Sequence, residues 1–107
     1  MSYNIIPTDN FNREAKKLAK KHRSLKSDLT ALGKELIENP TKGTHLGNSV
    51  YKMRMAITSK GKGKSGGARV ISYVLTQDEE IYLLSIYDKS EQSSISDNEI
   101  KELIKQL

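Results

Sequence analysis

The stretch Val50–Leu75 constrains the fold of this chain more than any other part of the sequence. It holds two apolar runs rich in β-branched residues, Val50–Ile57 and Ala68–Leu75, separated by a polar segment with four glycines and three lysines. Runs of this composition favour strands, and a glycine-containing connection between them favours a hairpin. We therefore predict two antiparallel strands joined by a mobile cationic loop.

The first of these runs has two different faces. Side chains of a strand point alternately to opposite sides, so Tyr51, Met53, Met55 and Ile57 share one face, which we assign to the core. The opposite face carries Lys52 and Arg54. The pattern thus predicts two cations side by side on a sheet surface.

The residues before Val50 predict one short strand and two helices. Tyr3–Ile6 is a β-like run ended by Pro7, and Thr8 and Asp9 can cap a helix that starts near Asn10. A second helix follows a connection too short for anything except a helical hairpin, and Asn39-Pro40 stops it. We interpret Thr41–Ser49 as a loop. The apolar stripes of the two helices have spacings of three and four residues and consist of Phe11, Ala15, Leu18 and His22, and of Leu25, Leu29, Leu32 and Leu36.

The residues after Leu75 predict a third strand of the hairpin series and a final helix. Ile81–Tyr87 is apolar on both faces, as Ala68–Leu75 is, which indicates strands covered on both sides. Ser96–Glu99 is a capping-box sequence, flanked by isoleucines placed for a hydrophobic staple. The order β-α-α-β-β-β-α predicts a single α+β domain over residues 1–107: a small antiparallel meander with an N-terminal helical hairpin and a C-terminal helix.

The charge is distributed unevenly along the chain. The net charge is +5, but residues 1–77 carry 15 Lys/Arg and 5 Asp/Glu, whereas residues 78–107 carry 3 and 8. No acidic residue occurs between Asn39 and Gln77. A basic body of this kind suggests a polyanionic partner, with a generally soluble basic protein as the alternative.

Other features limit the location and the chemistry. The chain has no cysteine, which rules out disulfides and thiolate metal sites and fits a reducing, cytoplasmic setting. We expect no signal peptide and no membrane span, since the start has no charged and apolar leader and no apolar run approaches about 20 residues. No acidic or histidine cluster has metal-ligand spacing, so we expect no metal and no small-molecule cofactor. Catalysis on a phosphodiester would then rely on Lys, Arg and Tyr.

The loop Gly61–Gly66 matches G-x-G-x-x-G, but a strand follows it, whereas a dinucleotide site requires a helix. The P-loop pattern also fails, because Thr58 stands where its leading glycine should be. We interpret Lys60, Lys62 and Lys64 as loop cations that attract nucleic-acid phosphates, with a flexible solvated turn of incidental charge as the alternative. Of the two histidines, His22 is expected to be structural, and His45 is a secondary candidate for a site role.

The sequence resembles the RelE/HigB toxins of bacterial toxin–antitoxin modules. Three segments carry the resemblance: Tyr51–Arg54, Gly66–Tyr73 and Ile86–Lys89. It implies the fold described above and an mRNA endonuclease that acts at the ribosomal A site and is held inactive by a cognate antitoxin. In that family the 2′-OH of the RNA attacks the adjacent phosphate without a metal.

The resemblance also implies site residues. Lys52 and Arg54 match the cations of the second strand of the family, and Arg69 matches the arginine of the third. Lys89 lies where a basic residue often follows the last strand, and Tyr87 is a candidate to stack on a base or to donate to the phosphate. Guanidinium groups stay protonated, so the two arginines are expected to bind the phosphate. Lys52 and Lys89 are the candidates to exchange protons.

Two points leave alternatives open. Some RelE toxins have a catalytic tyrosine near the last helix, where this chain has Ile95. Either Tyr87 replaces it, as in the HigB-like branch, or the chemistry of this chain is weaker. The related ParE toxins share the fold but inhibit DNA gyrase without cleaving RNA. The cations Lys52, Arg54 and Arg69 favour RNA over that alternative, and a member that only binds RNA or its antitoxin is a third possibility.

Overall fold

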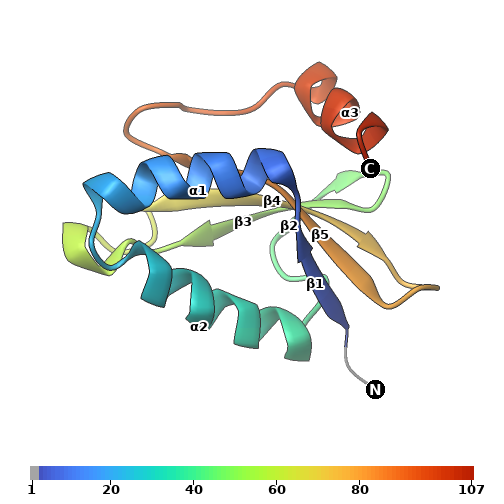
Figure 1. The fold of residues 1–107 in the computed structure, drawn as a ribbon, viewed down its shortest axis with the longest axis horizontal. Coiled ribbons are helices and arrows are strands. Elements are labelled where there is room, and N and C mark those ends of the chain that lie inside the picture. Colours follow the sequence, from blue (N-terminus) through green and yellow to red (C-terminus); the bar gives the residue numbers. More distant parts are fainter. Residues whose placement is uncertain (1–2) are drawn as a thin grey trace.

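The computed structural model describes residues 3–107 and contains one sheet with helices on both of its faces (Figure 1). The predicted helical hairpin, hairpin strands and C-terminal helix are all present, which confirms the α+β class. Along the chain the elements are β1 (Asn4–Pro7), α1 (Asp9–Lys21), α2 (Leu25–Glu38), β2 (Thr44–Gly47), β3 (Val50–Met55), the short 3-10 helix η1 (Thr58–Lys60), β4 (Ala68–Leu75), β5 (Glu80–Asp88) and α3 (Asp97–Lys105).

The five strands are arranged in the order β1-β5-β4-β3-β2. Strands β3 to β5 form the antiparallel meander that the hairpin connections predicted, and β2 extends it in the same antiparallel sense. Strand β1, however, pairs with β5 in parallel, so the sheet is mixed and not wholly antiparallel. Hairpin connections determine only the direction of strands that are neighbours in sequence. Nothing of that kind relates β1 to β5, which are separated by most of the chain.

Strand β2 lies inside the segment that we predicted as a loop. It has only four residues, three of them exposed, and therefore has no alternation of apolar and polar side chains from which a strand could be predicted. Its pairing with β3 depends on a tight turn in which Asn48 and Ser49 both have positive φ angles, of 50° and 65°. That combination is typical of the two-residue turns that join adjacent antiparallel strands.

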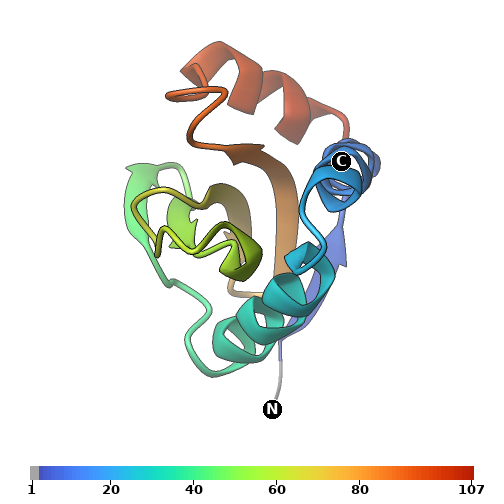
Figure 2. The same ribbon diagram turned by 90° about the vertical axis from the view of Figure 1, so that its left-hand side faces the viewer.

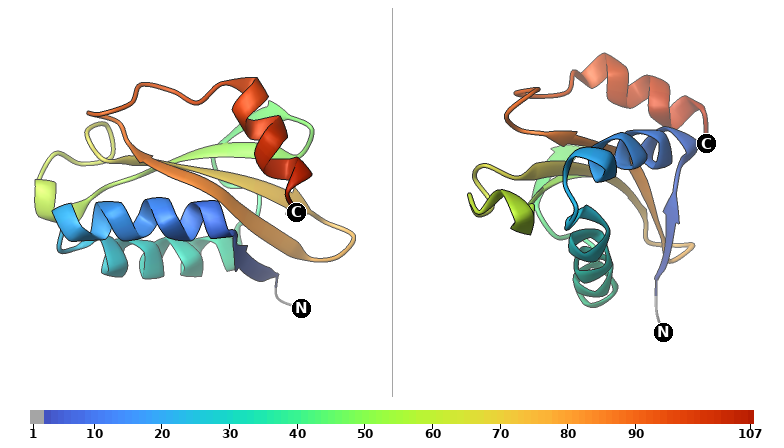
Figure 3. Two further views of the ribbon diagram at one scale, coloured as in Figure 1. Left: turned by 45° about the horizontal axis from the view of Figure 1, so that its top comes forward. Right: turned by 60° about the vertical axis from the view of Figure 1, so that its left-hand side comes forward.

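The helices cover the two faces of the sheet unequally. Helices α1 and α2 pack on one face, and α3 lies on the other (Figures 2 and 3). The larger apolar cluster is on the α1/α2 side and includes the apolar members of both predicted stripes, though not His22, together with Met53, Met55 and Ile57. The smaller cluster on the α3 side consists of Val50, Ile71, Leu84, Tyr87 and Ile100. Strands β4 and β5 are thus covered on both faces, as predicted.

Strand β5 contains a bulge, and polar side chains of helix α1 form hydrogen bonds with groups at this bulge. Ile71 is opposite Ser85 and Ser72 is opposite Leu83, so Leu84 has no partner in β4. The carbonyl of Leu84 accepts a hydrogen bond of 2.9 Å from Asn10. The Glu14 carboxylate accepts from the Ser85 hydroxyl at 2.7 Å. These bonds attach α1 to the middle of β5.

The loop between β3 and β4 is attached to the helical hairpin at its start. Asp28 of α2 accepts hydrogen bonds from the backbone N–H and the hydroxyl of Thr58, at 3.0 and 2.6 Å. The loop ends at Gly67, where a Cβ atom would lie 2.2 Å from the Met55 carbonyl oxygen, so only glycine allows this close backbone approach. We call residues 61–67 the glycine-lysine loop. In Figure 1 it lies at the same end of the molecule as the α1–α2 turn.

Two buried serines in neighbouring central strands provide a test of this packing. The hydroxyl of Ser72 has no hydrogen-bond partner in the described structure, whereas that of Ser85 is bonded to Glu14. We expect Ser72→Ala to raise the free energy of unfolding by about 1 kcal/mol, since it removes a buried unpaired hydroxyl. Ser85→Ala should lower it by about 1–3 kcal/mol, because Glu14 loses a donor. Urea unfolding measures both, and equal effects of the two substitutions would contradict the packing described.

Candidate functional site

Three predicted site residues lie in one row across the sheet. In the strand register Arg54 of β3 is opposite Arg69 of β4, and Arg69 is opposite Tyr87 of β5. Residues opposite each other in antiparallel strands have Cα atoms about 4.5–5.5 Å apart and side chains on the same face. Tyr87 belongs to the cluster on the α3 side, so the row faces α3. Lys52 is two residues from Arg54 along β3 and shares this face.

The members of the row differ strongly in exposure. Arg54 is exposed and Lys52 is half-buried, whereas the exposed fractions of Arg69 and Tyr87 are only 8% and 4%. The guanidinium group of Arg69 donates to the backbone carbonyls of Lys64 at 3.0 Å and of Ala68 at 3.1 Å. Arg69 therefore binds the glycine-lysine loop in this structure, and Arg54 is the guanidinium group of the row that solvent reaches freely.

The hydroxyl of Tyr87 is buried and has no hydrogen-bond partner among the described residues. Burial raises the pKa of this phenol above its ordinary value, and the positive charge of Arg69 only partly opposes the effect. The phenol is thus protonated at neutral pH, which makes it a hydrogen-bond donor and a poor base. Such an unsatisfied donor beside a guanidinium group suits an incoming anionic oxygen.

Lys89 lies next to the glycine-lysine loop, just after β5. Its backbone N–H donates to the Gly67 carbonyl at 3.0 Å. Its ammonium group is exposed and donates to the Ser93 carbonyl at 3.0 Å, so the lysine folds over the segment that leads to α3. The structure therefore brings the backbone of Lys89 to the site while its charge is held by a neighbouring carbonyl.

The three loop lysines have different environments. Lys62 and Lys64 are exposed, and Lys64 shares a small groove of about 150 Å³ with Arg54. Lys60, in contrast, is only 12% exposed and forms an ion pair of 2.7 Å with Asp88. The side chains of Lys62 and Lys64 are thus open to solvent, whereas the ammonium group of Lys60 is already bound inside the protein.

Asp88 also lies in the site region. It belongs to the segment Ile86–Lys89 that carries the family resemblance, but no role was predicted for it. Its side chain is 4% exposed and contacts Lys60, the backbone N–H of Ser90 at 2.9 Å and the imidazole of His22 at 3.2 Å. Burial by itself raises the pKa of this carboxyl, but the hydrogen bonds from Lys60 and Ser90 outweigh it and leave the pKa below its ordinary value. A signal existed in the sequence: an acid directly after an apolar strand, beside a cationic segment.

The two histidines lie outside the row. His22 follows α1 and bonds to Asp88, which agrees with the structural role predicted for it. His45 is exposed on β2 and its ring stacks on Tyr51, with 4.9 Å between the ring centroids. No group of three or more His, Asp or Glu side chains within residues 3–107 is arranged to hold a metal ion. No helix in that range is long and apolar enough to cross a membrane.

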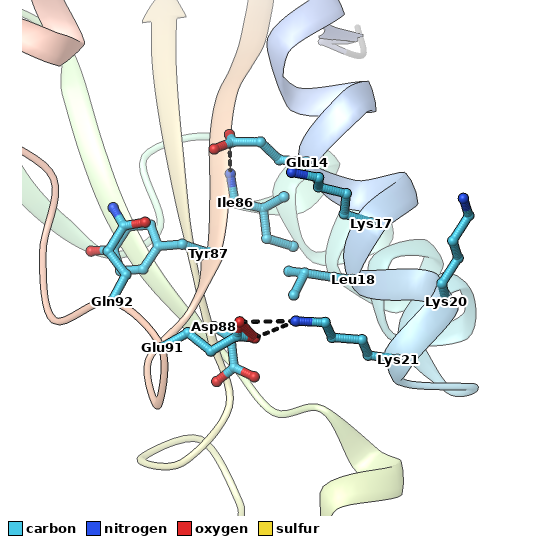
Figure 4. Close-up of a pocket in the computed structure, with 10 residues that line it drawn as sticks. All are labelled: Glu14, Lys17, Leu18, Lys20, Lys21, Ile86, Tyr87, Asp88, Glu91 and Gln92. Atoms are coloured by element: carbon cyan, nitrogen blue, oxygen red, sulfur yellow. Dashed lines mark hydrogen bonds and ion pairs between the residues drawn. The ribbon is translucent and has the colours of Figure 1, made fainter.

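A larger hollow of about 520 Å³ lies between α1 and the end of β5 (Figure 4). Lys17, Lys20 and Lys21 of α1 border it, and Lys21 pairs with Glu91 at 3.0 Å. The side chain of Tyr87 extends from β5 away from these lysines (Figure 4). Tyr87 nevertheless lines the hollow, so the hollow adjoins the row at this residue.

The ion pair of Asp88 predicts how stability depends on pH. Because the folded-state pKa is lowered, the carboxylate stabilises the fold above the ordinary Asp value of about 3.9, and this contribution is lost as the pH falls through the lower folded-state value. We expect Asp88→Asn to cost about 3 kcal/mol at pH 7, since Lys60 is left buried without a counter-ion. The loss of stability between pH 5 and pH 2 should be smaller than in the wild type.

Urea unfolding across this pH range checks the prediction. Glu91→Gln is the matched control, because it removes an exposed ion pair and should change stability by less than about 1 kcal/mol. A wild-type acid dependence in Asp88→Asn would contradict the assignment. Some acid sensitivity remains in either case from Asp28. Burial raises the pKa of that carboxyl, but hydrogen bonds from Thr58 and Ser24 lower it below its ordinary value.

Comparison with known proteins places this geometry in a family. Residues 4–107 match the model of the RelE toxin of the RelE/RelB toxin–antitoxin system. Among solved structures, a doubly substituted mutant of the Escherichia coli toxin RelE in the free state matches with a TM-score of 0.64 and 16% identity, covering 100% of this chain and 99% of that one.

Two toxin–antitoxin complexes are also similar in structure. The intact E. coli RelBE complex matches with a TM-score of 0.60 and 16% identity over 80% of this chain and 95% of that one. The RelBE2 complex from Mycobacterium tuberculosis matches with a TM-score of 0.61 and 15% identity over 82% of this chain and 99% of that one. At such identities these structures establish the fold, and the family model covers nearly the whole sequence. The chain therefore belongs to the RelE toxin family of RelE/RelB toxin–antitoxin systems.

Proposed function

We propose that this toxin is a ribosome-dependent mRNA endoribonuclease. The observation that carries the proposal is the row of Arg54, Arg69 and Tyr87, with Lys52 beside it on the same face of the sheet. Two guanidinium groups and a protonated phenol are donors suited to the oxygens of one phosphodiester. The exposed Lys62 and Lys64 extend this cationic surface toward the flanking phosphates of a single strand.

The proposed reaction uses the RNA as its own nucleophile. The 2′-oxygen attacks the adjacent phosphorus, the bond from phosphorus to the 5′-oxygen breaks, and the products are a 2′,3′-cyclic phosphate and a 5′-OH end. Arg54 and Arg69 stabilise the negative charge that develops on the phosphate, because their guanidinium groups cannot act as bases. Lys52 or Lys89 removes the 2′-OH proton or protonates the leaving oxygen. No step requires a metal ion.

The burial of Arg69 and Tyr87 adds a conformational requirement. In the structure the carbonyls of Lys64 and Ser65 occupy the guanidinium group of Arg69. A bound phosphate would replace these neutral acceptors with charged ones, which form stronger hydrogen bonds. The glycines of the loop allow this exchange at little steric cost. We therefore propose that the catalytic arrangement is completed when RNA displaces the loop carbonyls from Arg69, on the ribosomal A site.

We also propose that a cognate antitoxin protein inhibits the toxin. Two of the similar solved structures are toxin–antitoxin complexes. A net charge of +5 and a cationic face without acidic residues between Asn39 and Gln77 favour an acidic partner segment. Because mRNA and ribosomes are the proposed substrates, the toxin would act in the cytoplasm.

Replacing Arg54 tests the proposed activity. Its side chain is exposed and has no hydrogen bond or ion pair in the described structure, so Arg54→Ala should change stability by less than about 0.5 kcal/mol. Cleavage of mRNA on programmed ribosomes should fall by about 10²–10³. Arg23→Ala, in the exposed α1–α2 turn, is the matched control and should retain activity.

Mapping the products separates the proposed function from its alternative. The wild type should leave 5′-OH ends in the presence of EDTA and should stop protein synthesis on induction. If the purified wild type never cleaves mRNA on programmed ribosomes, the enzymatic proposal is wrong. Filamentation and a DNA-damage response on induction would instead support a toxin that inhibits gyrase.

Tyr87→Phe tests the hydroxyl alone. Because the hydroxyl has no partner in the free protein, its removal should leave stability unchanged or raise it by about 1 kcal/mol. Cleavage should nevertheless fall by about tenfold or more if the hydroxyl donates to the phosphate or the leaving group. Full activity of a stable Tyr87→Phe variant would assign Tyr87 to packing only.

A further inference from the structure

The Asp88–Lys60 ion pair is the most deeply buried pair of opposite charges in the described structure, and the proposed reaction does not use it. The exposed fractions of the two side chains are 4% and 12%, and Nζ lies 2.7 Å from Oδ1. The other ion pairs between lysines and carboxylates each have at least one side chain that is about half exposed or more. A charge pair that is shielded from water in this way can hold two segments together tightly, provided that its remaining donors are satisfied.

The remaining donors of Lys60 are satisfied by the loop itself and by the segment after β5. Its ammonium group also donates to the Gly66 carbonyl at 2.9 Å and to the Ser90 hydroxyl at 3.0 Å. Lys60 immediately precedes the glycine-lysine loop, and Gly66 is near its end. One side chain thus connects both ends of the loop to the carboxylate of Asp88.

Asp88 in turn is held by two residues outside the glycine-lysine loop. His22, after α1, bonds to its second carboxylate oxygen at 3.2 Å, and the Ser90 N–H bonds to the first at 2.9 Å. The backbone of Asp88 is paired with Ala68, next to the pair of Arg69 with Tyr87. The carboxylate therefore links the catalytic row to the loop that carries the exposed lysines.

We propose that Asp88, acting through Lys60, is a positioning residue that holds the glycine-lysine loop, with its exposed Lys62 and Lys64, in the position that places Lys64 beside Arg54. The loop contains three glycines between Lys60 and Gly67, which would otherwise leave its backbone free to take many conformations. Without the ion pair, the loop would be held by its hydrogen bonds with Arg69, the Lys89 N–H and the Thr58 carbonyl, besides one bond within the loop from the Gly67 N–H to the Lys64 carbonyl. The proposal depends on the proposed function only in assigning the loop lysines to RNA.

Limited proteolysis tests the loop position without any reference to RNA. Trypsin cuts after lysine, so reporter sites are present at Lys62 and Lys64 within the loop and at Lys60 directly before it. In Asp88→Asn, cleavage at these sites under native conditions should be faster on the order of tenfold, because local opening becomes easier. In Glu91→Gln, which breaks the exposed pair with Lys21, cleavage should match the wild type. Equal rates in all three proteins would overturn the proposal.

A second variant separates positioning from general destabilisation. Lys60→Met/Asp88→Asn removes both charges, so no buried charge is left unpaired and most of the stability should return. The loop should nevertheless remain sensitive at Lys62 and Lys64, because the connection to Gly66 is gone. Lys60→Arg keeps a cation with several donors beside Asp88, so the loop of this variant should be as resistant to trypsin as that of the wild type. If resistance to trypsin follows the free energy of unfolding of each variant, and not the presence of the connection from Asp88 through Lys60 to Gly66, the proposal is overturned.

The salt dependence of RNA binding tests the consequence. A fluorescent single-stranded RNA oligonucleotide is titrated with each protein over a range of salt concentrations. If the loop lysines leave the RNA, the slope of log K against log salt should become shallower by about 0.7 for each phosphate that the protein no longer neutralises. The double variant and Lys64→Met should each show a shallower salt slope, by similar amounts. A triple variant that carries all three substitutions should show a slope reduced by less than the sum of these two reductions.

The outcomes distinguish this proposal from the proposed function. A fall in affinity with an unchanged slope would mean a loss of folded protein, which overturns the positioning role. If the wild type binds no RNA, the proposed function fails, and the proteolysis result alone decides whether Asp88 positions the loop. If the wild type binds RNA and the double variant keeps both its slope and its resistance to trypsin, the positioning role is wrong.

Discussion

The register of β4 with its two neighbours determines where every candidate catalytic side chain lies. Side chains alternate along a strand, so a slip of one residue between β3 and β4 would move Arg54 to the opposite face from Arg69. The register is held by the apolar side chains on the α1/α2 face, among them Met53, Val70 and Ile86, which occupy one row of pairs. Burial of this row in the core makes any other register costly, because apolar groups would be exposed and arginines buried. The core on one face thereby orders the charges on the other.

That order has an energetic cost at the site. Arg54 and Arg69 are directly opposite each other, and like charges in such pairs are destabilising. Neither guanidinium group has a carboxylate partner within residues 3–107, and Arg69 is satisfied only by neutral carbonyls. The Tyr87 hydroxyl is a further donor without an acceptor. These donors have no charged acceptor in the free protein, and a phosphate would supply the missing negative charge and acceptor atoms. Functional sites commonly give up local stability in this way.

Much of the fold could be predicted because it depends on local pattern. The span of β4 agrees with its apolar run, and the caps of α1 and α3 formed at Thr8 and Ser96. The apolar members of both helical stripes face the core. Strand β2 could not be predicted, because an edge strand of four residues, three of them exposed, has no apolar face. The parallel pairing of β1 could not be predicted either, since it joins segments that are distant in the chain and have no connecting turn to set their direction.

For the site, the sequence by itself determined the chemistry that is available, and the tertiary structure decided which groups can use it. Lys52, Arg54, Arg69 and Tyr87 could be selected from alternation and motif, because a strand places every second residue on one face. Whether a charge is free or already bound depends on segments far away in the chain. Lys60 appears equivalent to Lys62 and Lys64 in the sequence, but Asp88 binds it, because the end of β5 passes the start of the loop. The role of Asp88 likewise exists only in three dimensions, where burial and hydrogen bonds with Lys60, Ser90 and His22 turn an ordinary carboxylate into a structural link.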